Sequence, residues 1–366
     1  MITRDVRDAI ARALAETGLD PAADPGLRPG GAPGRYSSSV AFGLAKAERR
    51  DPDEIAATLA VALTAQPWIA RATATGTGYL TIAVTEETLA AQLTEADPAR
   101  VARSDALRGA TVAAPVADPL AAATWEEARK ALAAELTARL AAAAGATVTS
   151  PADPERAVAA PTGNRVSRAG EAVAAATGGE APGTGGDCRD RSAEDNESAE
   201  DNGEVTAAVA FAGADAVRFA LARAVPGRRV RLDPAKIARH VLDNPAYAVR
   251  YAHARAASGV RWAVALAAGG QAGPLRLAAD PADLVLLDAL SWLPERVATA
   301  ARRGRPDEFA RYLEELASLA VAALTTTSNP GSARAPGTDK LALARAAQAG
   351  LAAGLGLLGV SAPDRL

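Results

Sequence analysis

The stretch that decides the fold is Asn244-Pro-Ala-Tyr-Ala-Val-Arg-Tyr-Ala-His-Ala-Arg255. Asn244 is a favourable N-cap and Pro245 suits a first turn, so the pattern predicts a helix that begins at Pro245. Tyr247, Tyr251 and Arg255 follow at intervals of four residues and therefore share one face of that helix. Aromatic rings and a guanidinium on one face can hold unstacked bases of a nucleic acid. Taken alone, the spacing fits core tyrosines with satisfied hydroxyls better.

Helical periodicity extends from this stretch to the end of the chain. The predicted helices are Asp215–Ala224, Asp233–His240, Pro245–Ala268, Pro281–Ala301, Pro306–Thr325 and Thr338–Leu358. Several begin with Asp or Thr and an early Pro, which are start signals of helices. Residues 205–366 are therefore predicted to form an all-helical bundle. Its expected core residues are Leu286, Leu287, Leu290, Trp292, Leu293, Phe309, Leu313, Leu316, Leu319, Leu355 and Leu358.

Basic residues gather around the quoted stretch. Between Asp215 and Arg261 there are ten Lys or Arg and three Asp, although the whole chain has a net charge of −3. This local excess fits an anionic partner, or else a solvated face enriched in arginine by a GC-rich genome. The arginines expected to contact phosphates of such a partner are Arg218, Arg228, Arg229, Arg231 and Arg250.

Residues 1–97 predict a separate α+β domain. Helices are expected over residues 1–20, 36–48, 51–65 and 86–94, and the third has Asp51 as its N-cap. Two strands, Ile69–Thr75 and Tyr79–Val84, flank Gly76-Thr-Gly78, which is a hairpin signal.

Residues 98–149 contain a shorter α/β unit. A strand at Thr111–Val116, a helix at Thr124–Ala144 and the start of a second strand at Thr147–Thr149 are typical of a parallel sheet. Residues 150–204 contain almost no large apolar side chains and are predicted to be a disordered linker. The predicted fold class is mostly α, with a small α+β N-terminal domain and an all-α C-terminal domain.

Composition excludes several classes of protein. The single cysteine, Cys188, excludes an intrachain disulfide framework and a cysteine zinc site. No Asp/His/Cys cluster has metal-ligand spacing. No run approaches about 18 strongly apolar residues, and the first residues lack the apolar core of a signal peptide. We therefore expect a cytoplasmic protein with no membrane partner.

Three segments in order, with fitting spacing, resemble the anticodon-binding domain of arginyl-tRNA synthetases: Gly213–Phe219, Asn244–Arg255 and Gly356–Leu366. The N-terminal domain resembles the extra domain of the same family, which reads the outer corner of the tRNA. The matching segments there are Tyr36–Lys46, Asp51–Ala56 and Gly78–Ile82.

The resemblance implies that tRNA is the partner, with its phosphates at the five arginines named above. It implies that anticodon-loop bases lie at Tyr247, Tyr251 and Arg255. It also places Asn244, Tyr36 and Tyr79 among the residues that bind tRNA.

The middle of the chain departs from the family at the positions that catalysis needs. Class I synthetases have a His-rich tetrapeptide at a helix start and a later lysine loop, and both stabilise the phosphate during adenylate formation. Alignment with the family puts Thr124-Trp-Glu-Glu127 at the tetrapeptide and Glu204–Ala210 at the lysine loop. Residues 98–149 are thus interpreted as a strand–helix–strand remnant of the Rossmann-like catalytic fold. No cofactor is expected, although the family uses ATP and Mg²⁺.

Three hypotheses about function remain open at this point. The first is a tRNA-binding relative of the synthetases that has lost aminoacylation. The second is an arginine–tRNA ligase, acting alone or with another protein chain that supplies the active site. The third is a protein-interaction scaffold, in which the helical bundle binds a partner and the tyrosines belong to its core.

Overall fold

A computed structural model describes residues 2–91, 97–115, 117–149, 203–267, 281–325 and 338–366. The predicted disordered linker, 150–204, lies outside these residues except for its last two. The described chain is mostly helical, as predicted, and forms two compact units. One unit contains Met1–Asp97, Ala256–Pro294 and Leu319–Gly350, and the other contains Pro98–Arg255, Glu295–Ser318 and Leu351–Leu366.

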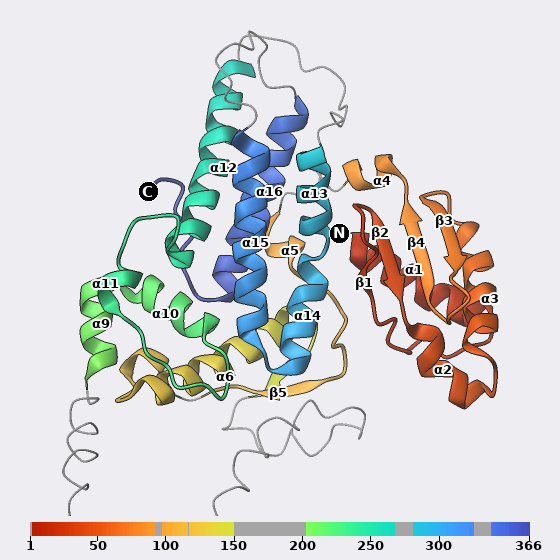
Figure 1. Cartoon of the computed structure of the whole chain (residues 1–366), viewed down its shortest axis with the longest axis horizontal. Helices are drawn as coiled ribbons and strands as arrows, with labels where there is room; N and C mark the ends of the chain where they lie inside the picture. The colour runs from red at the N-terminus through yellow and green to blue at the C-terminus, as the bar shows by residue number, and fades with distance from the viewer. Residues whose placement is uncertain (1, 92–96, 116, 150–202, 268–280, 326–337) are drawn as a thin grey trace, which may run out of the picture. The chain divides into compact units, whose positions relative to one another are not determined.

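The N-terminal region contains a four-stranded antiparallel sheet in the order β1-β2-β4-β3 (Figure 1). Its strands are β1 (Arg28–Pro29), β2 (Arg35–Ser38), β3 (Ile69–Ala74) and β4 (Leu80–Val84). Leu80, Ile82 and Val84 alternate along β4 and are all buried, because successive side chains of a strand point to opposite faces. Helix α3 (Pro52–Thr64) packs against β3 and β4, so the core of this region lies between helix and sheet.

The other helices of this region are α1 (Ile2–Glu16), α2 (Val40–Glu48) and α4 (Glu86–Ala91). Asp51 caps α3 as predicted, because its carboxylate accepts a hydrogen bond of 2.8 Å from the N–H of Asp53. The prediction of a helix over 36–48 is wrong for its first residues. Tyr36 and Ser38 are buried on either side of a half-buried Ser37, which is the alternation of a strand, and they belong to β2.

Residues 98–149 form α5 (Pro98–Val101), β5 (Thr111–Ala113), the 3-10 turn η2 (Pro119–Ala121), α6 (Trp125–Ala143) and β6 (Thr147–Thr149). Strands β5 and β6 pair in parallel, as the strand–helix–strand prediction requires. Among the described residues no third strand joins them, so this sheet has two strands.

The C-terminal helices are α9 (Glu204–Ala212), α10 (Ala214–Arg223), α11 (Pro234–Ile237), α12 (Pro245–Ala267), α13 (Pro281–Ser291), α14 (Leu293–Arg303), α15 (Pro306–Thr325) and α16 (Thr338–Leu357). Helix α9 has no counterpart among the predicted helices. The predicted helix Pro281–Ala301 is two helices that separate at Trp292. Pro294 lacks an N–H and fits the first turn of a new helix better than the middle of a long one.

Ten of the eleven predicted core residues are buried, and Leu319 is half-buried. Glycines allow helix α16 to approach its neighbours closely. A Cβ added at Gly350 would lie 2.6 Å from a methyl group of Leu290, and one added at Gly354 would collide with Leu313. These two glycines therefore serve helix packing rather than chain flexibility.

Candidate nucleic-acid interface

Three aromatic rings stack on one another at the start of α12. The rings of Tyr247 and Tyr251 have centroids 5.9 Å apart and planes inclined by 24°. The ring of His240, from the segment before the helix, stacks on Tyr247 at 5.4 Å and 11°. His240 is exposed and both tyrosines are half-buried, so none of the three is enclosed in the core. We refer to His240, Tyr247 and Tyr251 as the aromatic column.

Asn244 holds the segment that carries His240. Its Nδ2 donates to the carbonyl oxygens of Ile237 and Arg239, each over 2.7 Å. Its Oδ1 accepts from the N–H of Ala246 over 3.2 Å, which is the predicted capping bond. Asn244 is only 8% exposed, and both of its amide N–H groups are engaged within the protein. The prediction that it contacts tRNA does not fit this burial, and its role here is to fix the local backbone.

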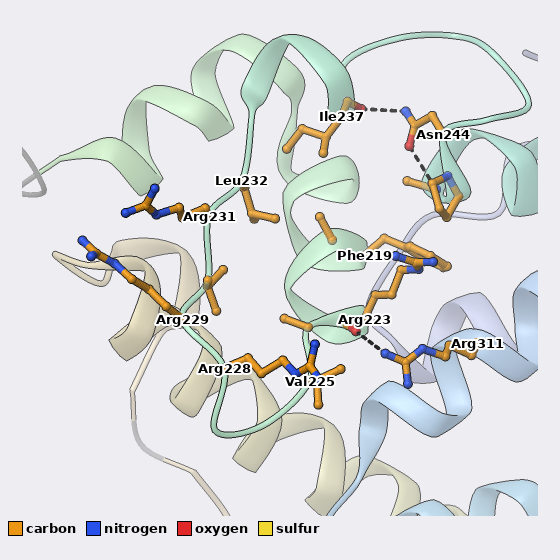
Figure 2. A pocket seen from close by; sticks show the side chains of 15 residues that line it. Phe219, Arg223, Val225, Arg228, Arg229, Arg231, Leu232, Ile237, Asn244 and Arg311 are labelled. Atoms are coloured by element: carbon orange, nitrogen blue, oxygen red, sulfur yellow. Dashed lines mark hydrogen bonds between the residues drawn. The ribbon is translucent and has the colours of Figure 1, made fainter.

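A hollow of about 350 Å³ lies beside the start of α12 (Figure 2). Its apolar lining includes Phe219 on α10 and Val225 and Leu232 on the loop that follows. None of the residues that line the hollow is acidic. Five arginines belong to its lining: Arg223, Arg228, Arg229, Arg231 and Arg311.

Three of these guanidinium groups have no compensating charge in the described part of the protein. Arg228, Arg229 and Arg231 are exposed, and their side chains make no hydrogen bond or ion pair with another described residue. Figure 2 shows Arg229 and Arg231 extending from the same side of the loop. By contrast, Arg223 is 2.7 Å from Glu314 and Arg311 is 3.2 Å from Asp307. We refer to Arg228, Arg229 and Arg231 as the arginine loop.

Two other arginines that the sequence assigned to phosphates are engaged within the protein. Arg218 has a side chain that is 12% exposed, and its Nη2 lies 2.5 Å from the carboxylate of Glu135 on α6. Arg250 donates to the hydroxyl of Ser361 over 3.3 Å and lies 3.6 Å from the carboxylate of Asp215. Phosphate contact by Arg218 or Arg250 does not fit these bonds, which connect parts of the helical fold.

The same bonds explain why three separate segments of sequence form one signature. The backbone N–H of Ser361 donates to Asp215 over 3.1 Å, which joins the C-terminal segment to the start of α10. Nδ1 of the buried His253 lies 2.9 Å from the carbonyl oxygen of Pro363, and donates to it in the tautomer that this contact favours. Arg255 is half-buried one turn beyond Tyr251. The start of α10, the first turns of α12 and the C-terminal segment therefore fold together.

The N-terminal region presents an exposed aromatic pair, Phe42 and Tyr79. Tyr79 is 39% exposed, and its ring meets the ring of Phe42 edge-on, with centroids 4.9 Å apart. Phe42 is 44% exposed and was not predicted to bind tRNA, although it lies within the segment Tyr36–Lys46 that carries the resemblance.

Tyr36 is placed differently from Tyr79, because it is fully buried. Its hydroxyl oxygen lies 3.2 Å from Oγ of Ser291 and its ring centroid 5.4 Å from that of Trp292. Burial raises the pKa of Tyr36 well above its ordinary value of 10.0, because the charged form would lose its water. The prediction that Tyr36 binds tRNA does not fit this position, since no face of its ring is accessible.

The start of α6 is closed by its own side chains. Thr124 and Glu127 form a reciprocal capping box, with each side chain 3.3 Å from the backbone N–H of the other. Glu126 pairs with Arg129, and Trp125 is buried. A helix N-terminus can bind a phosphate through its free N–H groups, but here a carboxylate and a hydroxyl already occupy it.

The described residues contain no group of three or more His, Cys, Asp or Glu that could hold a metal ion. They also contain no helix with the length and apolar character needed to cross a membrane.

Comparison with known proteins gives two matches to family models. The model described as arginyl tRNA synthetase N terminal domain matches residues 4–84, and the DALR anticodon binding domain matches residues 249–366. The second range contains most of α12 and the whole C-terminal segment.

Individual relatives agree with these models. The arginine–tRNA ligases of Bifidobacterium longum strains DJO10A and NCC 2705 are 36% and 37% identical over 183 residues. These alignments cover 43% of this chain and 29% of each ligase, so the match spans less than a third of those relatives. The solved arginyl-tRNA synthetase of Thermus thermophilus has a TM-score of 0.64 at 18% identity, over 100% of both chains, which shows a similar fold. The chain is therefore related to the arginyl-tRNA synthetases and carries counterparts of their N-terminal domain and of their DALR anticodon binding domain.

Proposed function

We propose that this protein binds tRNA through Tyr247, Tyr251 and the arginine loop, and does not itself activate arginine. The observation that carries the proposal is the position of three uncompensated guanidinium groups beside a hollow that also borders the start of α12. A cluster of exposed positive charges beside a hollow whose lining contains no acidic residue attracts a polyanion. The match to an anticodon binding domain favours tRNA among polyanions.

The geometry suits a single-stranded loop of RNA better than a duplex. Proteins recognise such loops by stacking splayed bases on aromatic rings while arginines hold the phosphates. Tyr247 has the rings of His240 and Tyr251 as its stacked neighbours, so a base would join the column at one of its ends. Both tyrosines are half-buried and lie on a helix, so little side-chain freedom is lost when a base binds. Each stack of this kind contributes about 1–3 kcal/mol.

The proposed loss of arginine activation rests on the start of α6 and on composition. In the alignment with the family, Glu126 and Glu127 take positions at which negative charge develops during adenylate formation, and their carboxylates would oppose it. The capping box occupies N–H groups that a phosphate would need. The whole chain contains four lysines, Lys46, Lys130, Lys236 and Lys340, and none lies in Glu204–Ala210.

Fluorescence anisotropy of labelled arginine tRNA, titrated with the full chain over a series of salt concentrations, tests the binding. For each tenfold rise in salt concentration, we expect log K to fall by about 0.7 per phosphate that the protein neutralises on a single strand. Binding that is independent of salt, or absent at low salt, would contradict the proposal. ATP–pyrophosphate exchange with arginine tests the catalytic half, and exchange above background would show that arginine is activated.

A second candidate function is arginine–tRNA ligase activity that requires another protein chain. It is favoured by the relatives named above, which are arginine–tRNA ligases and of which this chain matches 29%. Aminoacylation of tRNA measured with the purified chain alone, and then with cell extract added, distinguishes the two candidates. A gain in charging above that of the extract alone would support the ligase.

A further inference from the structure

His240 is exposed and one face of its ring stacks on Tyr247, so the opposite face is open to a ligand. Its only ring contact among the described residues is Tyr247, and its side chain makes no hydrogen bond with them. The nearly parallel planes, 11° apart, mean that a further flat ring on the open face would extend the aromatic column. An exposed ring already stacked on a second ring has lost its rotational freedom before any ligand arrives, and such preorganisation strengthens binding.

The position of His240 depends on Asn244. Helix α11 ends at Ile237 and α12 begins at Pro245, so His240 lies on a segment without regular structure. The two hydrogen bonds from Nδ2 of Asn244 reach the carbonyls of Ile237 and Arg239, the latter directly before His240 in the chain. These bonds fix the segment against α12, where the ring can meet Tyr247.

The surroundings favour a nucleic-acid base as the ligand of this face. The hollow bordered by the arginine loop is also lined by Ile237, Asn244 and Pro245, which flank the segment that carries His240. A polyanionic strand held by Arg228, Arg229 and Arg231 would therefore bring its bases to the same small region. An aromatic side chain of a partner protein would gain nothing from those three charges.

We propose that the open face of His240 is a nucleobase-binding site that extends the aromatic column, and that Asn244 is its positioning residue. The proposal rests on the tRNA-binding function given above and goes beyond it. It assigns the outermost stacking surface to an imidazole that lies outside α12. It also assigns to Asn244 the role of holding that imidazole rather than of touching RNA.

The test uses the full chain and anticodon stem–loop RNAs in which 2-aminopurine replaces each loop base in turn. Stacking on a ring quenches the fluorescence of 2-aminopurine, so we expect quenching at one loop position or more with the unchanged protein. His240→Ala should abolish the quenching at one of these positions and weaken binding by roughly 5- to 150-fold, which corresponds to the loss of one stack. His240→Phe keeps a flat ring and should retain the quenching at that position.

Asn244→Ser tests the positioning role without a change of charge. Serine still caps the helix, so the helix content measured by circular dichroism should stay the same. Serine cannot donate the two hydrogen bonds that Asn244 gives to the carbonyl oxygens of Ile237 and Arg239. The quenching should therefore fall as it does in His240→Ala. Phe211→Ala removes an aromatic side chain on α9 that is 67% exposed, and serves as the control that should leave the quenching unchanged.

The outcomes separate the two proposals. If the unchanged protein binds the stem–loop and His240→Ala binds and quenches equally well, the inference about His240 is wrong and the tRNA-binding function stands. If Asn244→Ser retains full quenching, the positioning role of Asn244 is wrong. If the unchanged protein binds neither the stem–loop nor whole tRNA, both the proposed function and this inference fail.

Discussion

Nη2 of Arg218 lies 2.5 Å from Oε1 of Glu135, and this contact joins helix α10 to helix α6. Arg139 lies 2.8 Å from the same carboxylate oxygen, so Glu135 serves two cations. A side chain at Gly359 would collide with both guanidinium groups, since an added Cβ would lie 2.7 Å from each. The helix interpreted as a catalytic remnant is thus built into the helical fold as a packing partner.

Removal of this contact is expected to change stability and not RNA affinity. Arg218→Ala leaves the carboxylate of Glu135, 15% exposed, with one cation fewer, and should lower the free energy of unfolding by about 1.5–3 kcal/mol. Urea denaturation followed by circular dichroism measures the change. Arg229→Ala, on an exposed arginine without a partner, should leave stability unchanged within about 0.5 kcal/mol. If Arg218→Ala bound tRNA more weakly at unchanged stability, Arg218 would contact tRNA after all.

Substitution of the arginine loop is expected to change RNA affinity and to leave stability unchanged. Substitution of Arg228, Arg229 and Arg231 together by alanine should reduce the slope of log K against log salt by about 2, because three phosphate contacts of about 0.7 each are lost. The free energy of unfolding should stay close to that of the unchanged protein, since these side chains contact no other described charge. The measurement is tRNA anisotropy at several salt concentrations.

A control with the same change of net charge is available. Arg12, Arg100 and Arg103 are exposed, and none of them lines the hollow. Their triple substitution by alanine removes three positive charges elsewhere. If this control lowers the salt slope as much as the arginine-loop variant does, the attraction comes from net charge and not from a local site.

Local signals explain which parts of the fold could be predicted. The predicted bounds of helix α12 agree with the structure within one residue, because Asn244 and Pro245 are local start signals of a helix. Arg218 was assigned to phosphate because its partner Glu135 lies 83 residues away, and no local pattern reveals such a pairing. His240 was missed for a related reason. Its stacking on Tyr247 requires the chain to turn back at Asn244, which depends on side-chain bonds that periodicity does not report.

The contact of Asp288 with Gly34 predicts a dependence of stability on pH. The backbone N–H of Gly34 donates to the carboxylate over 2.9 Å, yet burial raises the pKa of Asp288 above its ordinary 3.8. The folded state therefore binds more protons than the unfolded state in the pH range between the ordinary pKa of 3.8 and the higher folded pKa. The contribution of Asp288 is complete below about pH 3.8 and is lost as the pH rises through the folded pKa.

Asp288→Asn removes this titration and keeps an oxygen that can accept from Gly34. The variant should match or exceed the unchanged protein in free energy of unfolding near neutral pH. The difference between the two should shrink as the pH is lowered toward about 4. Urea denaturation across this range measures it, with Asp8→Asn, an exposed carboxylate on α1, as the control. A variant that is less stable at neutral pH would show that the charge of Asp288 is favourable where it lies.

The exposed pair Phe42 and Tyr79 predicts a contact with tRNA outside the anticodon arm. The two rings meet edge-on at 4.9 Å and are 44% and 39% exposed, so each offers surface on which a base can stack. They lie in the region that matches the synthetase N-terminal domain, whereas the aromatic column, residues 240–251, lies where the C-terminal match begins. Tyr79→Ala should therefore weaken binding of whole tRNA about ten-fold and leave binding of an isolated anticodon stem–loop unchanged. Tyr36→Phe is the matched control, because it alters a buried tyrosine of the same N-terminal region and should change neither affinity. If Tyr79→Ala weakens the two RNAs equally, the N-terminal pair does not act separately from the helical site.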